Sequence, residues 1–466
     1  MGTPRFEERC SLVGKRLTHD IQTLHSFVLE AGLPPDIGAD SSDTTTIESI
    51  LQEKKAFDTS LNFEKLGLDD DEHGWTPRAP SNPTVSSSLP SRSNILSVSV
   101  FDLQMPSAAE VQQYIAVTTA DRKLHLLDPA LPNFEVVRSY SSFQDSPILD
   151  IVTLSTQHFL AASMSGRLVL FDTVQDKVLE ERKDHSKYIV KVATFTKGAT
   201  IWVATAGWDA KIFLYQLDTG GGSLGEPAAQ LTLPSIPETL AFVTSPEDGT
   251  PLLLLTRRDS TFLFFYTLPS LDVPVLELLG KQNLAPHSNA WISFTPSDVQ
   301  ISPTDPSLVA VATSTTPHMK LLVVKLLIPT KTSSLLAASL VQDLNGNVTQ
   351  ASQARAELLI QDREEAAILV NVSTLAPQTQ YSTPRLVWRP DGSGIYVSSD
   401  DGVVRGIEAS TGKLMATLKA HEPGSKLRCL WAGNKRGSHD GHSSMNIQHE
   451  LLISGGFDQK LIVWHE

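Results

Sequence analysis

The sequence predicts an all-β fold, a seven-bladed β-propeller preceded by a short α-helical segment. The first observation is the end of the chain, where residues 451–453 form an apolar strand, residues 455–458 a tight turn, and residues 460–464 a second strand. The second observation is that this hairpin recurs. Its second strand begins at Leu124, Leu168, Ile212, Phe262, Leu321, Val403 and Leu461, with successive gaps of 44, 44, 50, 59, 82 and 58 residues. Repeats of ~40–45 residues are typical of propeller blades, so seven hairpins predict seven blades with loop insertions in the longer gaps. An eighth blade inside the 82-residue gap stays open.

Apolar segments before and after each hairpin supply the remaining strands of each blade. The expected strands are 95–101, 114–118, 123–127 and 135–139 in blade one; 148–154, 159–162, 168–171 and 178–182 in blade two; and 189–195, 201–205, 212–215 and 229–233 in blade three. Blade four spans residues 239–279, and blade five opens near Trp291 and includes 308–312, 321–327 and 368–372. Residues 331–365, rich in Ser, Gln and Asn, are interpreted as a connection within blade five. Blade six takes 385–389, 395–397, 403–407 and 414–418, and blade seven takes 427–431 and the terminal hairpin.

The terminal hairpin resembles the WD40 repeat, with Trp464-His465 where that family usually has Trp-Asp. The resemblance covers residues 94–466 and implies that two blades keep the family's hydrogen-bonded tetrad of His, Ser or Thr, Asp and an aromatic residue. These structural tetrads are His185, Thr205, Asp209 and Tyr215 in blade three, and His421, Ser454, Asp458 and Trp464 in blade seven. A bond series of this kind would fix the turn of its blade, so we expect a structural and not a catalytic role for each histidine.

Blade seven lacks a fourth strand, because the chain ends after the third. In WD40 propellers this strand comes from the N-terminal side and removes the exposed sheet edges. The donor is therefore expected within residues 69–93, a Pro- and Ser-rich linker, with residues 84–87 as the candidate. The predicted organisation is a helical segment at 1–68, this linker at 69–93, and the propeller at 94–466.

The N-terminal segment is expected to form two short amphipathic helices. The first carries the apolar stripe Leu17, Ile21, Leu24 and Phe27, and the second carries Ile47, Ile50, Leu51 and Phe57. Thr45 and Glu48 form a capping box at the start of the second helix. Helices this short need a partner surface to bury their stripes. That surface is either the propeller of the same chain or a second copy.

Thr23-Leu24, Phe27 and Glu30 resemble the second half of a LisH motif, a helical dimerisation element found ahead of many WD40 propellers. The first half of that motif is absent, since residues 12–20 read LVGKRLTHD. The LisH resemblance implies a homodimer, and the alternative is a helix that packs on its own propeller.

If the helices dimerise, replacing Leu24 and Phe27 together with aspartate should convert a dimer into a monomer, because charges in an apolar interface are costly. The circular dichroism of the propeller should not change. Light scattering at tens of micromolar measures the outcome, and a monomeric parent protein would contradict the dimer.

Composition restricts the function classes. With 52 acidic against 38 basic residues, the chain has a net charge of −14, which argues against a nucleic-acid partner. Two cysteines, Cys10 and Cys429, build no disulfide framework. No apolar run reaches the ~20 residues of a membrane span, and the N-terminus is no signal peptide. We therefore expect a cytoplasmic or nuclear protein without a membrane partner.

Motifs for catalysis and cofactor binding are missing from the sequence. It contains no phosphate-binding Gly-x-x-x-x-Gly-Lys-Ser/Thr and no Gly-x-Ser-x-Gly nucleophile elbow. His439, Asp440, His442 and His449 have no zinc-ligand spacing and are interpreted as a polar loop. No catalytic residue, cofactor or metal is expected.

The WD40 resemblance therefore implies a non-enzymatic scaffold or adaptor that presents its propeller faces to partner proteins. One alternative is a subunit of a ubiquitin-ligase or chromatin assembly, for which LisH-plus-WD40 proteins give a precedent. A propeller enzyme is the second alternative, and carboxylates and histidines gathered at one mouth of the channel would favour it.

Overall fold

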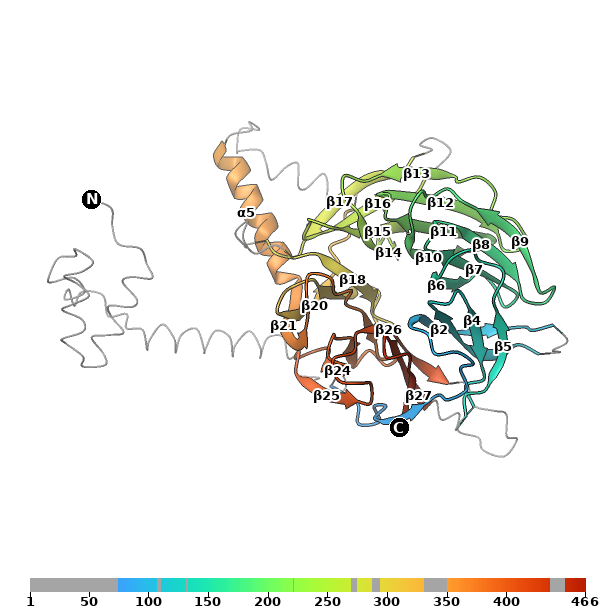
Figure 1. The fold of residues 1–466 in the computed structure, drawn as a ribbon. Helices are drawn as coiled ribbons and strands as arrows, with labels where there is room; N and C mark the ends of the chain where they lie inside the picture. The colour runs from blue at the N-terminus through green and yellow to red at the C-terminus, as the bar shows by residue number, and fades with distance from the viewer. Residues whose placement is uncertain are drawn as a thin grey trace, which may run out of the picture. The chain divides into compact units, whose positions relative to one another are not determined.

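A computed structural model of the chain describes residues 74–106, 110–130, 133–220, 222–269, 275–286, 294–330, 350–435 and 449–466. The chain divides into two compact units, residues 1–72 and 73–466. The helices predicted within residues 17–61 lie outside the described residues. The described strands form seven four-stranded antiparallel sheets around one axis, a seven-bladed β-propeller (Figure 1). The predicted fold class is confirmed.

Within each blade the strands follow one another from the axis to the rim. Blade one contains β2 (Ile95–Leu103), β3 (Gln112–Thr119), β4 (Leu124–Leu127) and β5 (Val136–Tyr140). Blade two contains β6 (Ile148–Thr153), β7 (His158–Ser163), β8 (Leu168–Asp172) and β9 (Lys177–Arg182). Blade three contains β10 (Ile189–Lys197), β11 (Thr200–Gly207), β12 (Lys211–Asp218) and β13 (Ala229–Thr232). Blade four contains β14 (Pro237–Thr244), β15 (Pro251–Arg257), β16 (Phe262–Thr267) and β17 (Glu277–Asn283).

The remaining blades follow the same order. Blade five contains β18 (Pro296–Ile301), β19 (Leu308–Thr313), β20 (His318–Lys325) and β21 (Ile368–Pro377). Blade six contains β22 (Leu386–Trp388), β23 (Gly394–Val397), β24 (Val403–Glu408) and β25 (Leu414–Lys419). Blade seven contains β26 (Leu427–Lys435), β27 (His449–Gly456), β28 (Leu461–His465) and, at its rim, β1 (Asn82–Val85).

The hydrophobic core lies between neighbouring blades. The two middle strands of a blade are covered on both faces, so they read as continuous apolar runs; every residue of β4 and of β8 is buried. The outermost strands contain more exposed residues, with only one buried residue each in β13 and β25. Between blades one and two, for example, Tyr140 of β5 and Phe171 of β8 meet edge-on with ring centroids 5.1 Å apart. This packing holds the turns at the ends of the strands in fixed positions.

Blade seven is completed by a strand from the linker. β1 pairs antiparallel with β28, and Asn82, Pro83, Thr84 and Val85 lie opposite His465, Trp464, Val463 and Ile462. The hydroxyl of Thr84 also lies 3.1 Å from Nε2 of His465. The strand overlaps the candidate segment 84–87 in Thr84 and Val85 and begins two residues earlier. The last strand of the chain therefore has no free edge along this register.

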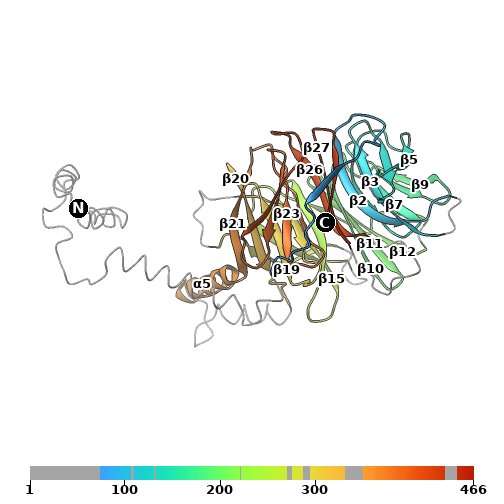
Figure 2. The same ribbon diagram turned by 90° about the horizontal axis from the view of Figure 1, so that it is seen from below.

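The segment expected to be a connection in blade five contains a helix, α5 (Gln350–Ala366). It is rich in Ala, Glu, Leu and Gln, which are good helix formers, but it has no apolar stripe, so the periodicity did not indicate it. α5 projects outward from the rim of the propeller (Figures 1 and 2). Near its end, Glu364 accepts a 2.7 Å hydrogen bond from the backbone N–H of Asn283 in β17. No helix among the described residues has the length and apolarity to cross a membrane.

Candidate protein-interaction face

One face of the ring carries the turn between the second and third strands of each blade and the connection that enters the next blade. We call it the turn face. In six blades this turn contains one residue with a positive φ of 59–82°: Arg122, Gly166, Ala210, Asp259, Gly402 and Gln459. The turn of blade five instead contains a cis peptide bond between Thr316 and Pro317. Six turns thus share one backbone geometry, and their side chains differ.

Blade seven brings its four tetrad residues together. The indole N–H of Trp464 donates to Oγ of Ser454 at 2.9 Å, and Ser454 Oγ lies 2.8 Å from Nε2 of His421. Nδ1 of His421 lies 2.8 Å from Oδ2 of Asp458. Because an indole N–H can only donate, the Ser454 hydroxyl is free to donate to Nε2, and Nδ1–H then donates to the carboxylate. The carboxylate also accepts the backbone N–H of Glu422 at 3.1 Å, which ties the turn to the preceding connection.

Blade three brings together three of its four residues in the same way. His185 lies 2.9 Å from Thr205 Oγ1 and 3.0 Å from Asp209 Oδ1. The hydroxyl of Tyr215 instead donates at 2.8 Å to Asp184, the residue before His185. A Cβ on Gly207 would lie 2.1 Å from Nδ1 of His185, so the close approach of the ring requires glycine there.

Burial and hydrogen bonding set the charges of these groups. Burial lowers the pKa of His185, in spite of the hydrogen bond that its ring donates to Asp209, so the ring is neutral near pH 7. Burial by itself would raise the pKa of Asp209 and of Asp458. The hydrogen bonds from the histidines and the backbone outweigh it and hold the pKa of both carboxyls below the usual value. Each histidine thus has a hydrogen-bond partner at both ring nitrogens, and both rings are buried.

Replacing Asp458 with alanine should lower the free energy of unfolding by about 1–3 kcal/mol, because the His421 Nδ1–H and the Glu422 N–H lose their acceptor. Since the folded-state pKa of Asp458 is depressed, its contribution is present above the unfolded pKa of about 3.9 and is lost as the pH falls further. Urea unfolding of parent and variant at pH 7 and pH 3.5 measures both effects. A variant as stable as the parent at pH 7 would make Asp458 an ordinary exposed turn residue.

In other blades, hydrogen bonds from different side chains hold the same turn. The tetrad pattern with histidine did not predict these side chains. In blade one the hydroxyl of Ser91 donates to Asp121 at 2.9 Å. In blade two the roles are reversed, and Ser165 on the turn donates at 2.7 Å to Asp145 on the connection. The available signal was the hydroxyl or carboxylate that precedes the positive-φ residue in five of the six turns.

In blade four the charge of the turn is inverted. Arg258 stands where four other blades have an aspartate, and it forms an ion pair with Glu238. Its guanidinium also lies 4.8 Å from the ring centroid of Trp208 on the turn of blade three. Trp208 stacks on Tyr188 with centroids 4.7 Å apart and an interplanar angle of 28°. Tyr188, Trp208 and Arg258, all partly exposed, form a corner of two aromatic rings and a cation, which we call the aromatic corner.

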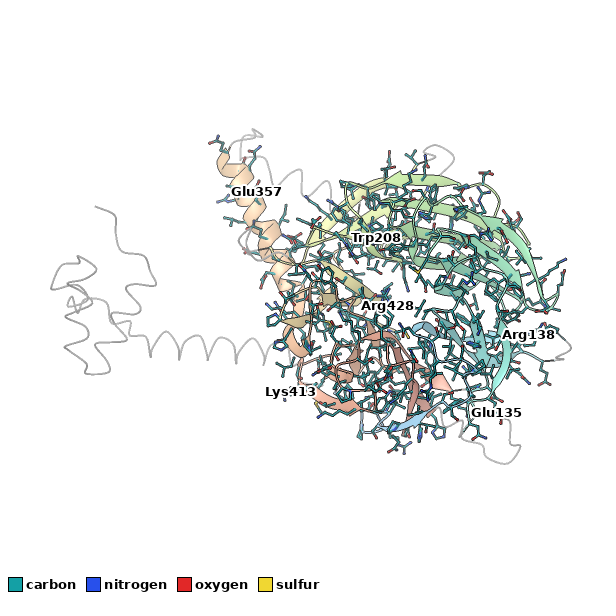
Figure 3. The ribbon with its side chains drawn as sticks, in the orientation of Figure 1. Glu135, Arg138, Trp208, Glu357, Lys413 and Arg428 are labelled. Atoms are coloured by element: carbon teal, nitrogen blue, oxygen red, sulfur yellow. The ribbon has the colours of Figure 1, made fainter. Side chains whose placement is uncertain are left out.

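The innermost strands carry a second regular feature at the turn face. In six blades the register of the innermost strand shifts after its first pair, which leaves one extra residue: Leu96, Leu149, Val190, Glu238, Ser297 and Arg428. Bulges of this kind re-aim a side chain. Viewed along the axis, Arg428 lies near the centre of the ring, while Trp208 lies farther out (Figure 3). The extra residue of blade seven is therefore a cation near the centre of the turn face, and we call the ends of the innermost strands around it the mouth.

A buried ion pair between blades six and seven was also missed. Nη2 of Arg389 donates to Glu450 at 2.7 Å and Nε donates at 3.1 Å, with Arg389 1 % and Glu450 7 % exposed. Burial raises the pKa of Glu450, against the lowering effect of the guanidinium. The Trp75 ring centroid lies 4.6 Å from the Arg389 guanidinium, and a Cβ on Gly394 would lie 2.3 Å from this ring. A tryptophan inside a Pro- and Ser-rich linker was the available signal.

The remaining predicted residues lie outside the described part of the chain. These are the self-association candidates Leu17, Ile21, Leu24, Phe27, Ile47, Ile50, Leu51 and Phe57, and also His439, Asp440 and His442. In the part that is described, no group of three or more His, Cys, Asp or Glu side chains is arranged to hold a metal ion.

The ring of seven closed blades defines the chain as a β-propeller protein. A family model described as "UCP007778, beta-propeller domain" matches residues 80–465, most of the chain, so the protein belongs to this family. The match begins two residues before β1 and ends at the last residue of β28. No curated protein matches the sequence significantly.

Proposed function

We propose that the protein is a non-enzymatic scaffold of the WD40-like kind that binds partner proteins at its turn face. The observation that carries the proposal is the aromatic corner. Tyr, Trp and Arg are the residues most enriched at binding hot spots, because each offers a large contact area together with a polar group. Here all three are partly exposed, and the turns that carry them are held by inter-strand packing and by the tetrad of blade three.

The chemistry of the turn face favours binding over catalysis. At the mouth, Asp150 lies 3.5 Å from the Lys191 ammonium and Asp298 lies 3.8 Å from the Arg385 guanidinium, while Glu238 pairs with Arg258. Burial raises the pKa of the Cys429 thiol to about 12, which makes it a poor nucleophile. These groups are paired or protonated, which weakens the case for the enzyme alternative.

Affinity purification of the tagged full-length protein, followed by quantitative mass spectrometry, tests the proposal. Trp208→Ala should reduce the recovery of a direct partner at least tenfold, since a hot-spot truncation costs about 2 kcal/mol or more. Met415→Ala is the control, because Met415 is 46 % exposed on the outermost strand β25. Partners identified as ubiquitin-ligase or chromatin subunits would select that alternative. Partners that are unaffected by Trp208→Ala but lost with Leu359→Asp on α5 would contradict a turn-face scaffold.

A further inference from the structure

Arg428 differs from the other cations at the mouth because no described carboxylate forms an ion pair with it. Lys191 is paired with Asp150, Arg385 with Asp298, Arg258 with Glu238, and Lys426 with Asp400 at 3.0 Å. The guanidinium of Arg428 donates instead to a neutral acceptor, the Thr383 hydroxyl. Among the described groups, Arg428 is therefore a cation at the mouth that has no carboxylate partner, in addition to the four ion pairs.

The surroundings of Arg428 make this charge costly. Burial lowers the pKa of the Arg428 guanidinium to about 10, and the neighbouring Arg385 acts in the same direction. An arginine that is desolvated beside a second arginine destabilises the fold unless an anion joins it. Groups kept in unfavourable surroundings of this kind are candidates for binding. The bulge in β26 is what brings the side chain to this place.

We propose that Arg428, with Arg385 beside it, binds a single oxyanion, a carboxylate or a phosphate, that a protein partner presents at the turn face. This inference rests on the proposed scaffold function and names the chemistry of the partner. A guanidinium matches both oxyanions, because its planar N–H groups donate two parallel hydrogen bonds to either. The partly exposed Tyr188 lies within electrostatic range of Arg428, so the same partner can contact the aromatic corner.

The neighbouring carboxylates restrict the ligand to one anionic group. Asp150, Glu238, Asp298 and Asp400 are the partners of the other four cations, and the whole chain has a net charge of −14. A nucleic acid needs a basic stripe that tracks many phosphates, and repulsion from these acids opposes such a polyanion. An acidic or phosphorylated side chain on an extended peptide brings one anionic group to Arg428.

The experiment uses the full-length protein and fluorescent nine-residue peptide pools with random uncharged flanks and a fixed central residue. The central residue is Glu, Gln, phosphoserine or Ser, and binding is followed by fluorescence polarisation. We expect the Glu or the phosphoserine pool to bind at least tenfold more tightly than its uncharged counterpart. Tighter binding of phosphoserine assigns a phosphate monoester, and equal or tighter binding of Glu assigns a carboxylate.

Variants of the protein separate this site from the rest of the face. Arg428→Gln should abolish the preference for the charged pool. Arg428→Lys should retain only part of it, because the ammonium keeps the positive charge but cannot donate two parallel hydrogen bonds. Lys197→Gln is the matched control, since Lys197 lies at the opposite end of an innermost strand and donates to a backbone carbonyl, that of Gly249. Neither the control nor Trp208→Ala should remove the preference. Arg428→Gln should leave the melting temperature unchanged or raise it.

Several results would overturn the assignment. Equal binding of charged and uncharged pools, or a preference that is unchanged in Arg428→Gln, would show that Arg428 binds no oxyanion. The scaffold function, which is tested separately at Trp208, would not be affected by this result. Inorganic phosphate that binds as tightly as the phosphoserine pool would make the ligand a free ion. A single-stranded oligonucleotide that binds more tightly than every pool would make the ligand a polyanion. A lower melting temperature of Arg428→Gln without any effect on binding would make the residue structural.

Discussion

Replacing Glu450 with alanine is expected to lower the free energy of unfolding by about 3–5 kcal/mol, because the substitution leaves the charge of Arg389 buried without its partner. The guanidinium donates three N–H···O contacts to this carboxylate, from Nε at 3.1 and 3.2 Å and from Nη2 at 2.7 Å. Its remaining donor group, Nη1, is directed to Ser393 Oγ at 2.9 Å and to the carbonyl of Thr76 at 3.1 Å. A second carboxylate, that of Asp391, lies 3.7 Å from Nη2 and is partly exposed, so it compensates for the loss of Glu450 only in part.

The position of the ion pair increases the destabilisation expected when it is lost. Arg389 follows the innermost strand of blade six, and Glu450 lies at the start of β27 in blade seven, so the pair joins two blades. Trp75 packs over the guanidinium and lies edge-on to Tyr396, with centroids 5.7 Å apart. An unpaired guanidinium under this ring has to move to reach water, and the tryptophan has to move with it.

Glu422→Ala is the matched control for Glu450→Ala, because it removes a carboxylate of the same type from an exposed ion pair. Glu422 lies 3.2 Å from Lys460, and its side chain is 62 % exposed, so we expect a change within about 1 kcal/mol. The double variant Arg389→Met with Glu450→Leu should recover most of the loss, since an apolar pair of similar volume needs no charge compensation. Urea unfolding at pH 7 provides all three values. If Glu450→Ala costs no more than Glu422→Ala, the pair is not buried in solution.

Features that repeat along the chain were predictable. Seven hairpins of similar apolar pattern recur at intervals of 44 residues or more, so the fold class follows from the sequence without any long-range information. The tetrad of blade seven also lies within one repeat: His421, Ser454 and Asp458 are separated only by a strand and its insertion. A family pattern can therefore place them before the fold is known.

Features that join different repeats were not predictable from periodicity. Arg389 and Glu450 are 61 residues apart, and Trp75 is 333 residues from Glu408, which accepts its backbone N–H at 2.9 Å. Each of these side chains is unremarkable in its own segment. Arg428 was missed for another reason, because a strand pattern of period two does not show where one extra residue is inserted.

Removing residues 1–93 is expected to expose the edge of β28 and to cause aggregation, because β1 is the only described strand that covers this edge. The backbone bonds lost include Ser81 N–H to His465 O at 3.0 Å and Ser86 N–H to Leu461 O at 2.9 Å, as well as those of the β1–β28 register. At about 0.5–1.5 kcal/mol for each, the free energy of unfolding should fall by about 3 kcal/mol or more.

A series of three truncations separates the closing strand from the tryptophan beside it. A chain that begins at residue 74 keeps both Trp75 and β1 and is the reference, and one that begins at residue 80 keeps only β1. The chain that begins at residue 94 loses both. We expect the chain that begins at residue 74 to be monomeric. The chain that begins at residue 80 should be monomeric but less stable, because Trp75 no longer covers the Arg389 ion pair. The chain that begins at residue 94 should aggregate. Light scattering and thermal melting follow the series. A monomer with an unchanged melting temperature at residue 94 would show that the ring does not depend on β1 for closure, and aggregation already at residue 80 would move the decisive contact from the strand to Trp75.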